Sequence, residues 1–426
     1  MNGTRNRQEL CKSINSFVIA ASCTINTIYA VLTYSRGIQG VASFFLMIVY
    51  VLGLFNVVLL NRGKIKIQRG GIFLIIEIFL LCACILTFMF SEKETTITLG
   101  DYFFYCFLPP LFLLFDFDTE KVLRYGMYLS LVSCLEVNTL LADQAISWRF
   151  SQTNLGTIYD LLPCIILAMF HFAYYRREAS VFTKLCYVYY VYVLLRMLLV
   201  IVRGALLTLI FGVVLIYLNR PQSNMNIIKK WSTKKKILIG AGLISVLLII
   251  INFETVITWL YNALGSVGIN FGVVTKFYFY MSTGNVTDNR EPYYELVRQM
   301  FMKSPICGAG VQTFYAYSAD GAAYPHNYIL QFLFEGGLLL AVPLTYITIR
   351  ELFRVLGARY VDKEKMIFSS CLLLLSVVPG MFSMNIWYNR TFWMIVVFGL
   401  MGQKTDFKSR RNDENEDRGL NIPSVT

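Results

Sequence analysis

The chain has 426 residues, of which 56% are hydrophobic and only 15% are charged, and its mean hydropathy is +0.57. Soluble domains carry about 25% charged residues, so this composition excludes a soluble globular protein and predicts an all-α polytopic membrane protein. The formal net charge of +12 comes from basic residues in short clusters between apolar runs. That pattern follows the positive-inside rule and argues against a nucleic-acid partner.

Apolar runs close to the ~20 residues needed to cross a bilayer recur along the chain. They predict about twelve transmembrane helices, near residues 14–34, 41–60, 72–90, 97–115, 122–142, 158–175, 181–202, 205–218, 237–253, 328–349, 366–382 and 391–401. No internal repeat is visible, which counts against a transporter built on inverted repeats.

One long polar insert divides these spans. Residues 1–252 form an N-terminal membrane bundle, 253–327 the insert with short helices, 328–402 the C-terminal membrane helices, and 403–426 a charged tail. If the helices alternate, every basic cluster falls on one side of the membrane. Both termini are therefore predicted to be cytoplasmic, the insert external and the tail disordered.

Two arginines lie near the outer turn between the seventh and eighth spans. Arg203 occupies the turn, and Arg196 precedes it by seven residues, which predicts that both lie on one helix face. A buried membrane cation costs several kcal/mol unless it is paired or hydrated. The pair therefore suggests an anion path or head-group site, which Gly204 would let a ligand approach. The alternative is a snorkelling arginine at the interface.

Within the insert, Arg290 stands at the start of a predicted helix. Asp288 or Asn289 is the expected cap, Pro292 suits the first turn, and apolar residues recur at helical spacing over 291–302. The free N–H groups of a helix start attract anionic oxygens, so Arg290 is a candidate for an anionic ligand. An exposed loop arginine is the alternative.

The end of the insert carries a second group of candidates. Gly308 and Gly310 allow close backbone approach by a ligand, although Gly-x-Gly is more often only a tight turn. His326 precedes the span that begins at Tyr328, with Asn327 as its expected cap. The positive end of a helix favours a neutral imidazole, which can accept a proton from a hydroxyl. A hydrogen-bonded loop histidine is the alternative.

Other polar residues carry weaker signals. Glu335 lies nine residues beyond His326, about 13 Å deeper along a helix, and is expected to pair with Arg196 or Arg203 before serving any catalytic role. Asn154 caps a helix or reaches a sugar. Tyr324 belongs to a set of insert aromatics that either stack on sugar rings or anchor the loop at the interface. His171, the other histidine, is assigned a structural role near the cytoplasmic end of its span.

The order and spacing of these motifs resemble those of the O-antigen polymerase and O-antigen ligase superfamily. The resemblance rests on Thr153-Asn154, Arg203-Gly204-Ala205, Arg290, Pro305-Ile306-Cys307-Gly308-Ala309-Gly310, Pro325-His326-Asn327-Tyr328 and Glu335-Gly336. One departure is Val202, where the family often has Ser or Thr before the arginine.

The resemblance implies a membrane-embedded glycosyltransferase at the outer face of a bacterial cytoplasmic (inner) membrane. Its donor would be an oligosaccharide on undecaprenyl diphosphate, and its acceptor a hydroxyl of another glycan. His326 would be the general base, and Arg203 and Arg290 would bind the diphosphate. The substrate-binding candidates are Arg196, Gly308, Gly310, Asn154, Asn327, Tyr324 and Glu335.

The same reading predicts an inverting reaction with no cofactor. The carboxylates of the insert form no metal-ligand pattern such as Asp-x-Asp, so no metal requirement is expected. Partners would be the lipid bilayer, a chain-length regulator and a flippase of the same pathway. A polymerase of surface polysaccharide (O-antigen, capsule or exopolysaccharide) is favoured over a ligase, which the motifs do not separate. A lipid-linked sugar flippase or transporter, and a scaffold without chemistry, remain the alternatives from other classes.

Overall fold

The computed structural model describes residues 2–32, 40–60, 67–91, 93–135, 152–200, 203–219, 253–268, 272–283, 290–357 and 362–401. All regular secondary structure in these ranges is helical, which agrees with the predicted all-α class. All of the predicted span 237–253 except residue 253 lies outside the described residues, as does the whole tail 403–426.

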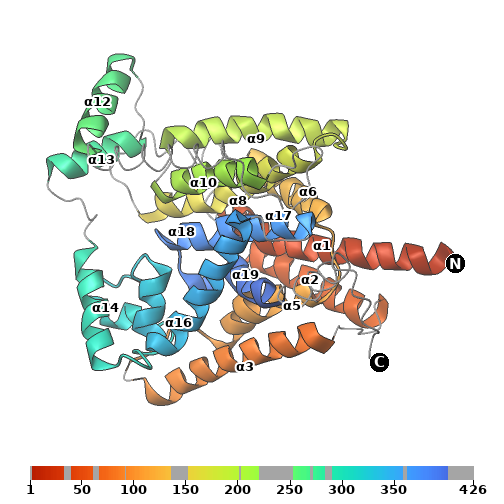
Figure 1. Cartoon of the computed structure of the whole chain (residues 1–426), viewed down its shortest axis with the longest axis horizontal. Coiled ribbons are helices and arrows are strands. Elements are labelled where there is room, and N and C mark those ends of the chain that lie inside the picture. The colour runs from red at the N-terminus through yellow and green to blue at the C-terminus, as the bar shows by residue number, and fades with distance from the viewer. Residues whose placement is uncertain are drawn as a thin grey trace, which may run out of the picture.

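Most of the long helices run roughly along one axis of the molecule, and α16 runs obliquely to them (Figure 1). They are α1 (Asn2–Ala30), α2 (Val41–Phe55), α3 (Ile67–Phe90), α8 (Gln152–Tyr175), α9 (Val181–Val200), α10 (Arg203–Asn219) and α16 (Tyr328–Leu356).

Shorter helices connect and fill this bundle. They are η2 (Asn56–Leu60), α4 (Leu99–Asp101), η3 (Tyr102–Phe107), α5 (Leu108–Leu111), η4 (Phe112–Leu114), α6 (Thr119–Leu129), η5 (Ser130–Leu135), α17 (Lys363–Leu372), η6 (Leu373–Val377), α18 (Val378–Gly380), η7 (Ile386–Tyr388) and α19 (Arg390–Met401). The polar insert contributes α12 (Phe253–Ser266), α13 (Gly272–Ser282), α14 (Glu291–Lys303) and α15 (Phe314–Tyr317).

Five helices among the described residues are long and apolar enough to cross a membrane. Their spans are Val41–Val58, Gly70–Thr87, Ile158–Tyr175, Val181–Leu198 and Tyr328–Leu356, and shorter apolar helices cover Leu99–Leu114, Gly204–Asn219 and Arg390–Met401. The chain is therefore a polytopic membrane protein. Each predicted span other than 237–253 overlaps helical backbone, and the count of twelve stays a prediction.

Burial separates central helices from peripheral ones. In α19 every residue from Arg390 to Gly399 is buried, and Trp387 and Trp393 are among the largest fully buried side chains. In contrast, α9 leaves most of its apolar residues exposed, with only 28% of its apolar window buried. Since exposed apolar surface on this scale needs lipid, α9 faces the bilayer and α19 forms the centre of the bundle.

The two ends of the bundle carry different elements. The end that carries α12, α13 and α14, at the left of Figure 1, is called the loop end. At the other end, where α1 begins, Lys12 lies 3.7 Å from Asp118 and the Thr119 hydroxyl donates to the carbonyl of Glu364. These contacts bring the starts of α6 and α17 beside the start of α1. Lys363 lies over the ring of Tyr174, so the α8–α9 turn is at that end too.

Candidate active site

The helix α14 places Arg290 at its entrance. The predicted helix 291–302 is confirmed as Glu291–Lys303, with Pro292 in the first turn. Arg290 itself occupies the N-cap position, without a side-chain cap bond and with helical backbone angles (φ −90°, ψ −7°). The predicted caps, Asp288 and Asn289, lie outside the described residues. The Arg290 Nη1 atom donates to the carbonyl of Phe382 at 2.9 Å, which orients the guanidinium.

His326 lies at the start of α16, as predicted. The Asn327 side chain caps this helix by accepting from the N–H groups of Ile329 and Leu330 at 3.0 and 3.2 Å. His326 has a positive φ of 59°. Backbone of this kind is uncommon outside glycine and persists where the surroundings hold it.

Two tyrosine rings hold the imidazole. The ring centroid of Tyr324 is 4.6 Å from that of His326, and the centroid of Tyr293 is 6.0 Å away. The Tyr293 hydroxyl donates to Asp320, which also accepts from Ser318 at 2.5 Å. Burial and this bond raise the pKa of Tyr293 to about 12, and the bonds from Ser318 and Tyr293 lower the pKa of Asp320. The Tyr293 phenol therefore stays protonated near neutral pH.

The short segment Met381–Ser383, which follows α18, joins these residues. Its three members contact three of the candidates. The Met381 carbonyl accepts from Asn327 at 3.5 Å and the Phe382 carbonyl accepts from Arg290, while the Ser383 side chain interacts with Tyr324. Burial raises the pKa of Tyr324, which Ser383 and Arg290 oppose.

The same segment touches the start of α10. A Cβ added to Gly204 would lie 2.7 Å from the Cβ of Phe382 and would clash with the Tyr159 hydroxyl. Arg203 is the first residue of α10, so its backbone lies beside Phe382, whose carbonyl binds Arg290. The structure thus brings the Arg203–Gly204 backbone, Arg290 and Asn327 to one turn, and nothing is described of the side chains of Arg203 and Asn154.

The expectation that Arg196 and Arg203 share a helix face is wrong. Arg196 lies in α9, which ends at Val200, and Arg203 opens the next helix. The Nε atom of Arg196 is buried and has no hydrogen-bond partner within the described ranges.

Gly308 and Gly310 form part of a loop that inserts into α16. The helix is broken at Gly337 (φ 55°, ψ −150°). Across the break, Ala309 N–H donates to Phe334 O at 2.7 Å, Gly310 N–H to Glu335 O at 2.8 Å, Leu338 N–H to Pro305 O at 2.9 Å, and Leu339 N–H to Ile306 O at 3.1 Å. The loop 305–310 therefore satisfies helix groups that would otherwise be unpaired inside the bundle.

Both glycines are needed for this close approach. A Cβ on Gly308 (φ 67°) would lie 2.6 Å from the backbone of Glu335 and Gly336. A Cβ on Gly310 (φ 110°) would lie 2.8 Å from Thr87, at the end of α3. The glycine turn is thus explained by backbone packing against α16 and α3.

Glu335 is buried in an amide network instead of an ion pair. Its carboxylate accepts from Gln331 at 3.0 Å and from the indole N–H of Trp387. Gln331 also donates to Asn385 at 3.0 Å, and Asn385 accepts from Gln312 at 2.6 Å. The expected pairing with Arg196 is wrong, because neutral donors already satisfy this carboxylate, and within the described residues no ion pair of Glu335 occurs. The side chain of Arg203, the other expected partner, lies outside the described part of the structure.

This network is one feature that sequence reasoning missed. Gln312 is buried with a positive φ of 57°, and the residues that meet it lie far away in the chain. The turn Met381–Ser383 was missed because it looks like the end of an apolar span. The Tyr293–Asp320 contact has no local signal either, since the two residues are 27 positions apart.

His171 lies far from this group, on α8. Its two ring nitrogens contact the Tyr187 hydroxyl at 2.6 Å and Glu120 at 3.1 Å. Its surroundings fit the structural role assigned from the sequence.

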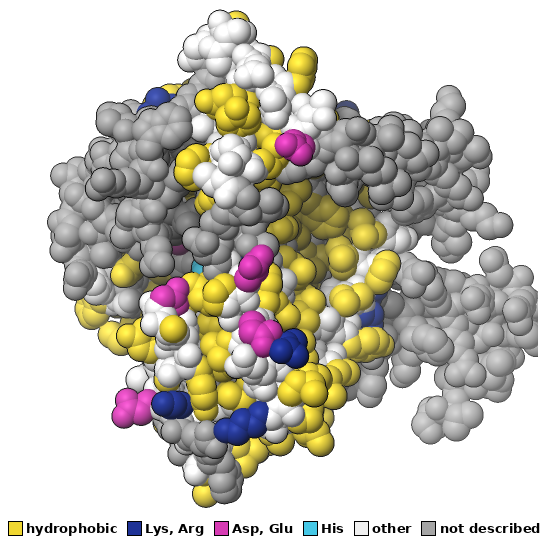
Figure 2. All heavy atoms as spheres, turned by 90° about the vertical axis from the view of Figure 1, so that its left-hand side faces the viewer, with side chains coloured by type: hydrophobic (Ala, Val, Ile, Leu, Met, Phe, Trp, Pro, Cys, Tyr) yellow, Lys and Arg dark blue, Asp and Glu magenta, His cyan; other side chains and the backbone are white. Residues whose placement is uncertain are grey.

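The surface at the loop end mixes polar and apolar side chains. Figure 2 shows acidic and basic side chains spread among hydrophobic ones over the face that carries α12 to α14. On α14, Arg298 pairs with Glu295 at 2.7 Å, and both are exposed. In the part of the chain that the structure describes, no group of three or more His, Cys, Asp or Glu could hold a metal ion.

Comparison with known proteins gives one match. Residues 162–345 match a family described as O-antigen ligase. The matched range begins in α8 and ends inside α16, so it includes Arg196, Arg203, Arg290 and His326 but neither Asn154 nor Met381–Ser383. No curated protein and no solved structure matches the chain.

Proposed function

We propose that this chain is a polymerase of a surface polysaccharide. The match of residues 162–345 to a family described as O-antigen ligase supports the O-antigen polymerase and ligase superfamily. The proposed polymerase joins oligosaccharide repeat units carried on undecaprenyl diphosphate. The site would lie at the loop end, on the outer face of the cytoplasmic membrane, with both termini inside. This orientation rests on the distribution of basic residues between the apolar runs.

The proposed step is a displacement at an anomeric carbon. A hydroxyl of the acceptor glycan attacks that carbon while the bond to the diphosphate oxygen breaks. His326 accepts the hydroxyl proton, and the leaving diphosphate keeps the bonding electrons. Arg203 and Arg290 neutralise its charge through charge-assisted hydrogen bonds. The attack from the opposite side inverts the anomeric configuration.

One observation carries this proposal. Arg290 and Asn327 each bond a backbone carbonyl of Met381–Ser383, the side chains of Tyr324 and Ser383 interact, and the Arg203–Gly204 step packs on the same segment. These contacts support a site in which His326, beside Asn327, and the two arginines act around this one short turn. That arrangement suits a reaction in which a proton leaves one oxygen while negative charge develops on another.

The other candidates take supporting roles in this proposal. Tyr324 would offer a ring to a sugar, and Asn154 and Asn327 would be near the substrate. Gly308 and Gly310 act through the backbone of the loop they shape. Arg196 would attract the anionic carrier, and Glu335 would hold the network below the site. A chain-length regulator and a flippase are the partners that such a pathway would supply.

The test is the size of the surface glycan on a gel, in a deletion strain complemented with wild type or His326→Ala. General-base catalysis contributes about 10²–10⁴-fold to rate, so His326→Ala should leave single repeats at unchanged protein levels. Arg298→Ala is the control, since it truncates an exposed side chain of α14 at the same end of the bundle. A full ladder with His326→Ala would contradict the base assignment.

A ligase is the second candidate, because the matching family is described by that activity. The two differ in acceptor: a polymerase extends a lipid-linked repeat unit, whereas a ligase uses lipid A core or a protein. Loss of a ligase would leave chains unattached to the final acceptor. Repeat units retained on the cytoplasmic side would instead favour a flippase. Activity of the purified protein that survives EDTA would support the proposed metal independence.

A further inference from the structure

A groove of about 740 Å³ lies between α8 and α9, in the half of the bundle opposite the loop end. Its walls are almost wholly apolar and include Phe172 and Val188. Val188 is 69% exposed and Phe172 is 46% exposed. Because α9 faces the bilayer, the groove opens toward lipid hydrocarbon, so an apolar chain can occupy it without leaving the membrane.

Three cations line the same groove at one end. Arg176 and Arg177 follow the last turn of α8, and Lys184 lies in the first turn of α9. No carboxylate is among the residues that line it. Glu178, the acidic residue nearest to these cations in the sequence, lies in the turn between α8 and α9 and does not line the groove. The groove therefore combines an apolar wall with a mouth of net positive charge.

Local bonds hold these cations at the mouth. The turn is closed by Glu178 N–H to Tyr175 O at 3.1 Å and Ala179 N–H to Arg176 O at 3.4 Å. The guanidinium of Arg176 lies 5.2 Å from the ring centroid of Phe172. Since Phe172 is also part of the apolar wall, the charge and the wall are in contact.

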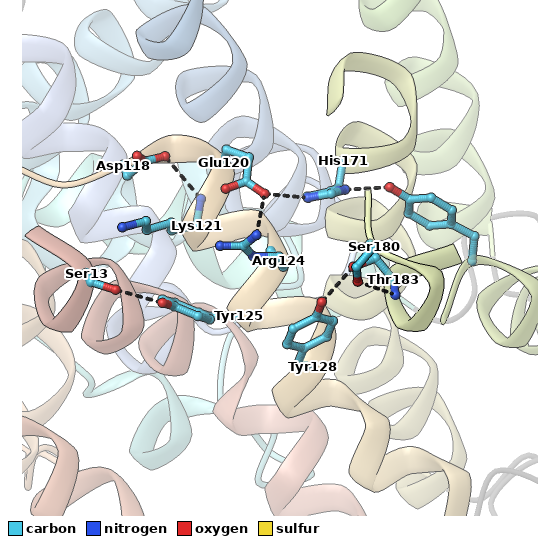
Figure 3. A network of polar contacts seen from close by, with 11 residues as sticks. Ser13, Asp118, Glu120, Lys121, Arg124, Tyr125, Tyr128, His171, Ser180 and Thr183 are labelled. Carbon is cyan, nitrogen blue, oxygen red and sulfur yellow. Dashed lines mark hydrogen bonds and ion pairs between the residues drawn. The ribbon is translucent and has the colours of Figure 1, made fainter. Parts of the chain in front are cut away.

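The back of the groove is fixed by a polar network. Tyr187 lines the groove, and its hydroxyl bonds His171 at 2.6 Å. Figure 3 shows Glu120 bonded to both His171 and Arg124. This series of side-chain bonds connects α6, α8 and α9. The groove is therefore already formed before a ligand binds, and the entropic cost of ordering it on binding is lower.

We propose that this groove binds an anionic phospholipid of the leaflet opposite the loop end. The phosphate would lie among Arg176, Arg177 and Lys184, and an acyl chain would follow the wall past Val188. Charge complementarity identifies the occupant: three lining cations and no lining carboxylate favour a negative head group over a zwitterionic one. The positive-inside rule assigns this leaflet to the cytoplasm, and the site does not depend on the proposed reaction.

The experiment uses the full chain in nanodiscs of equimolar phosphatidylglycerol and phosphatidylcholine, with bound lipid counted by native mass spectrometry after release. Each interfacial cation contributes about fivefold to the preference for an anionic lipid. The variant Arg176→Gln/Arg177→Gln/Lys184→Gln should therefore lose most of the enrichment. The control Arg7→Gln/Lys363→Gln/Lys365→Gln removes the same charge from residues that do not line the groove and should retain it.

A second variant, Val188→Trp, fills the groove and keeps the cations. It should also lower bound phosphatidylglycerol, which a purely electrostatic surface would not require. Unchanged enrichment in the first triple variant or in Val188→Trp would overturn the proposal, as would an equal loss in the control. Lipid extracted from native membranes that proves to be a polyprenyl phosphate would overturn the assigned occupant.

Discussion

At the break in α16, a glycine-to-alanine substitution is expected to destabilise the protein, whereas the same substitution within an ordinary helix stabilises it. In an ordinary helix this substitution stabilises by up to about 1 kcal/mol. At Gly337 the backbone angles lie in a region essentially limited to glycine, and a Cβ would lie 2.5 Å from the backbone of Ile306. Gly337→Ala must therefore distort the helix or expel the loop 305–310.

The magnitude follows from the bonds that cross the break. Holding a non-glycine residue in such angles costs about 1–3 kcal/mol. Loss of the four bonds between the loop and α16 removes about 0.5–1.5 kcal/mol each, so full expulsion adds about 2–6 kcal/mol. Unpaired backbone groups within a membrane favour the upper part of this range. The net effect is destabilisation of several kcal/mol, opposite in sign to the helix-propensity effect.

The assay is thermal unfolding of the purified chain in detergent, followed by size-exclusion chromatography after heating. Hydrogen exchange of peptides over 305–312 and 334–340 should show lost protection in Gly337→Ala. Gly71→Ala in α3 is the matched control, because a Cβ there meets nothing within 4 Å. Gly308→Ala should reproduce the defect from the loop side. A Gly337→Ala protein with wild-type melting temperature and protection would refute this account of the break.

Three further predictions concern the loop end. Arg290→Lys should lose most polymerisation in a gel assay, since lysine keeps the charge without the fork geometry, whereas Arg298→Lys on the exposed face of α14 should keep it. Asn327→Ala should lower the free energy of unfolding by about 1 kcal/mol through loss of the helix cap, measurable by denaturant titration. Asp320→Asn should leave the shape of the pH–activity profile unchanged near neutrality. The folded-state pKa of Asp320 is depressed, so its bond to Tyr293 is lost only as pH falls through that low value; a shifted acid limb would contradict this.

Local sequence signals predicted the parts of the fold that local chemistry determines. Pro292 and the apolar spacing after it predicted α14, and Asn327 predicted the cap of α16, because helix starts depend on residues within one turn. Apolar run lengths likewise predicted most of the membrane helices. In each case the physical cause and the sequence signal lie within a few residues of each other.

The features that escaped prediction depend on distant partners. Residues 328–349 read as one uninterrupted apolar helix, and only the contact with loop 305–310 explains why α16 breaks at Gly337. The partners of Glu335 are Gln331 and Trp387, and the second lies 52 residues away. A charge-based argument expects an arginine for a buried carboxylate, but neutral donors satisfy it here.

The packing at the break in α16 and the positions of the candidate site residues depend on each other. Non-helical backbone at membrane depth is tolerated only where other protein groups satisfy it, and the loop 305–310 does this for α16. The same loop continues into Gln312, which bonds Asn385, so the position of α16 and that of the segment after Met381–Ser383 are set together. Arg290 and Asn327, at the starts of separate helices, both bond Met381–Ser383 itself. The distance between the arginine and the histidine beside Asn327 is therefore controlled by the packing of the break, and a substitution at Gly337 should impair the site without touching a residue in it.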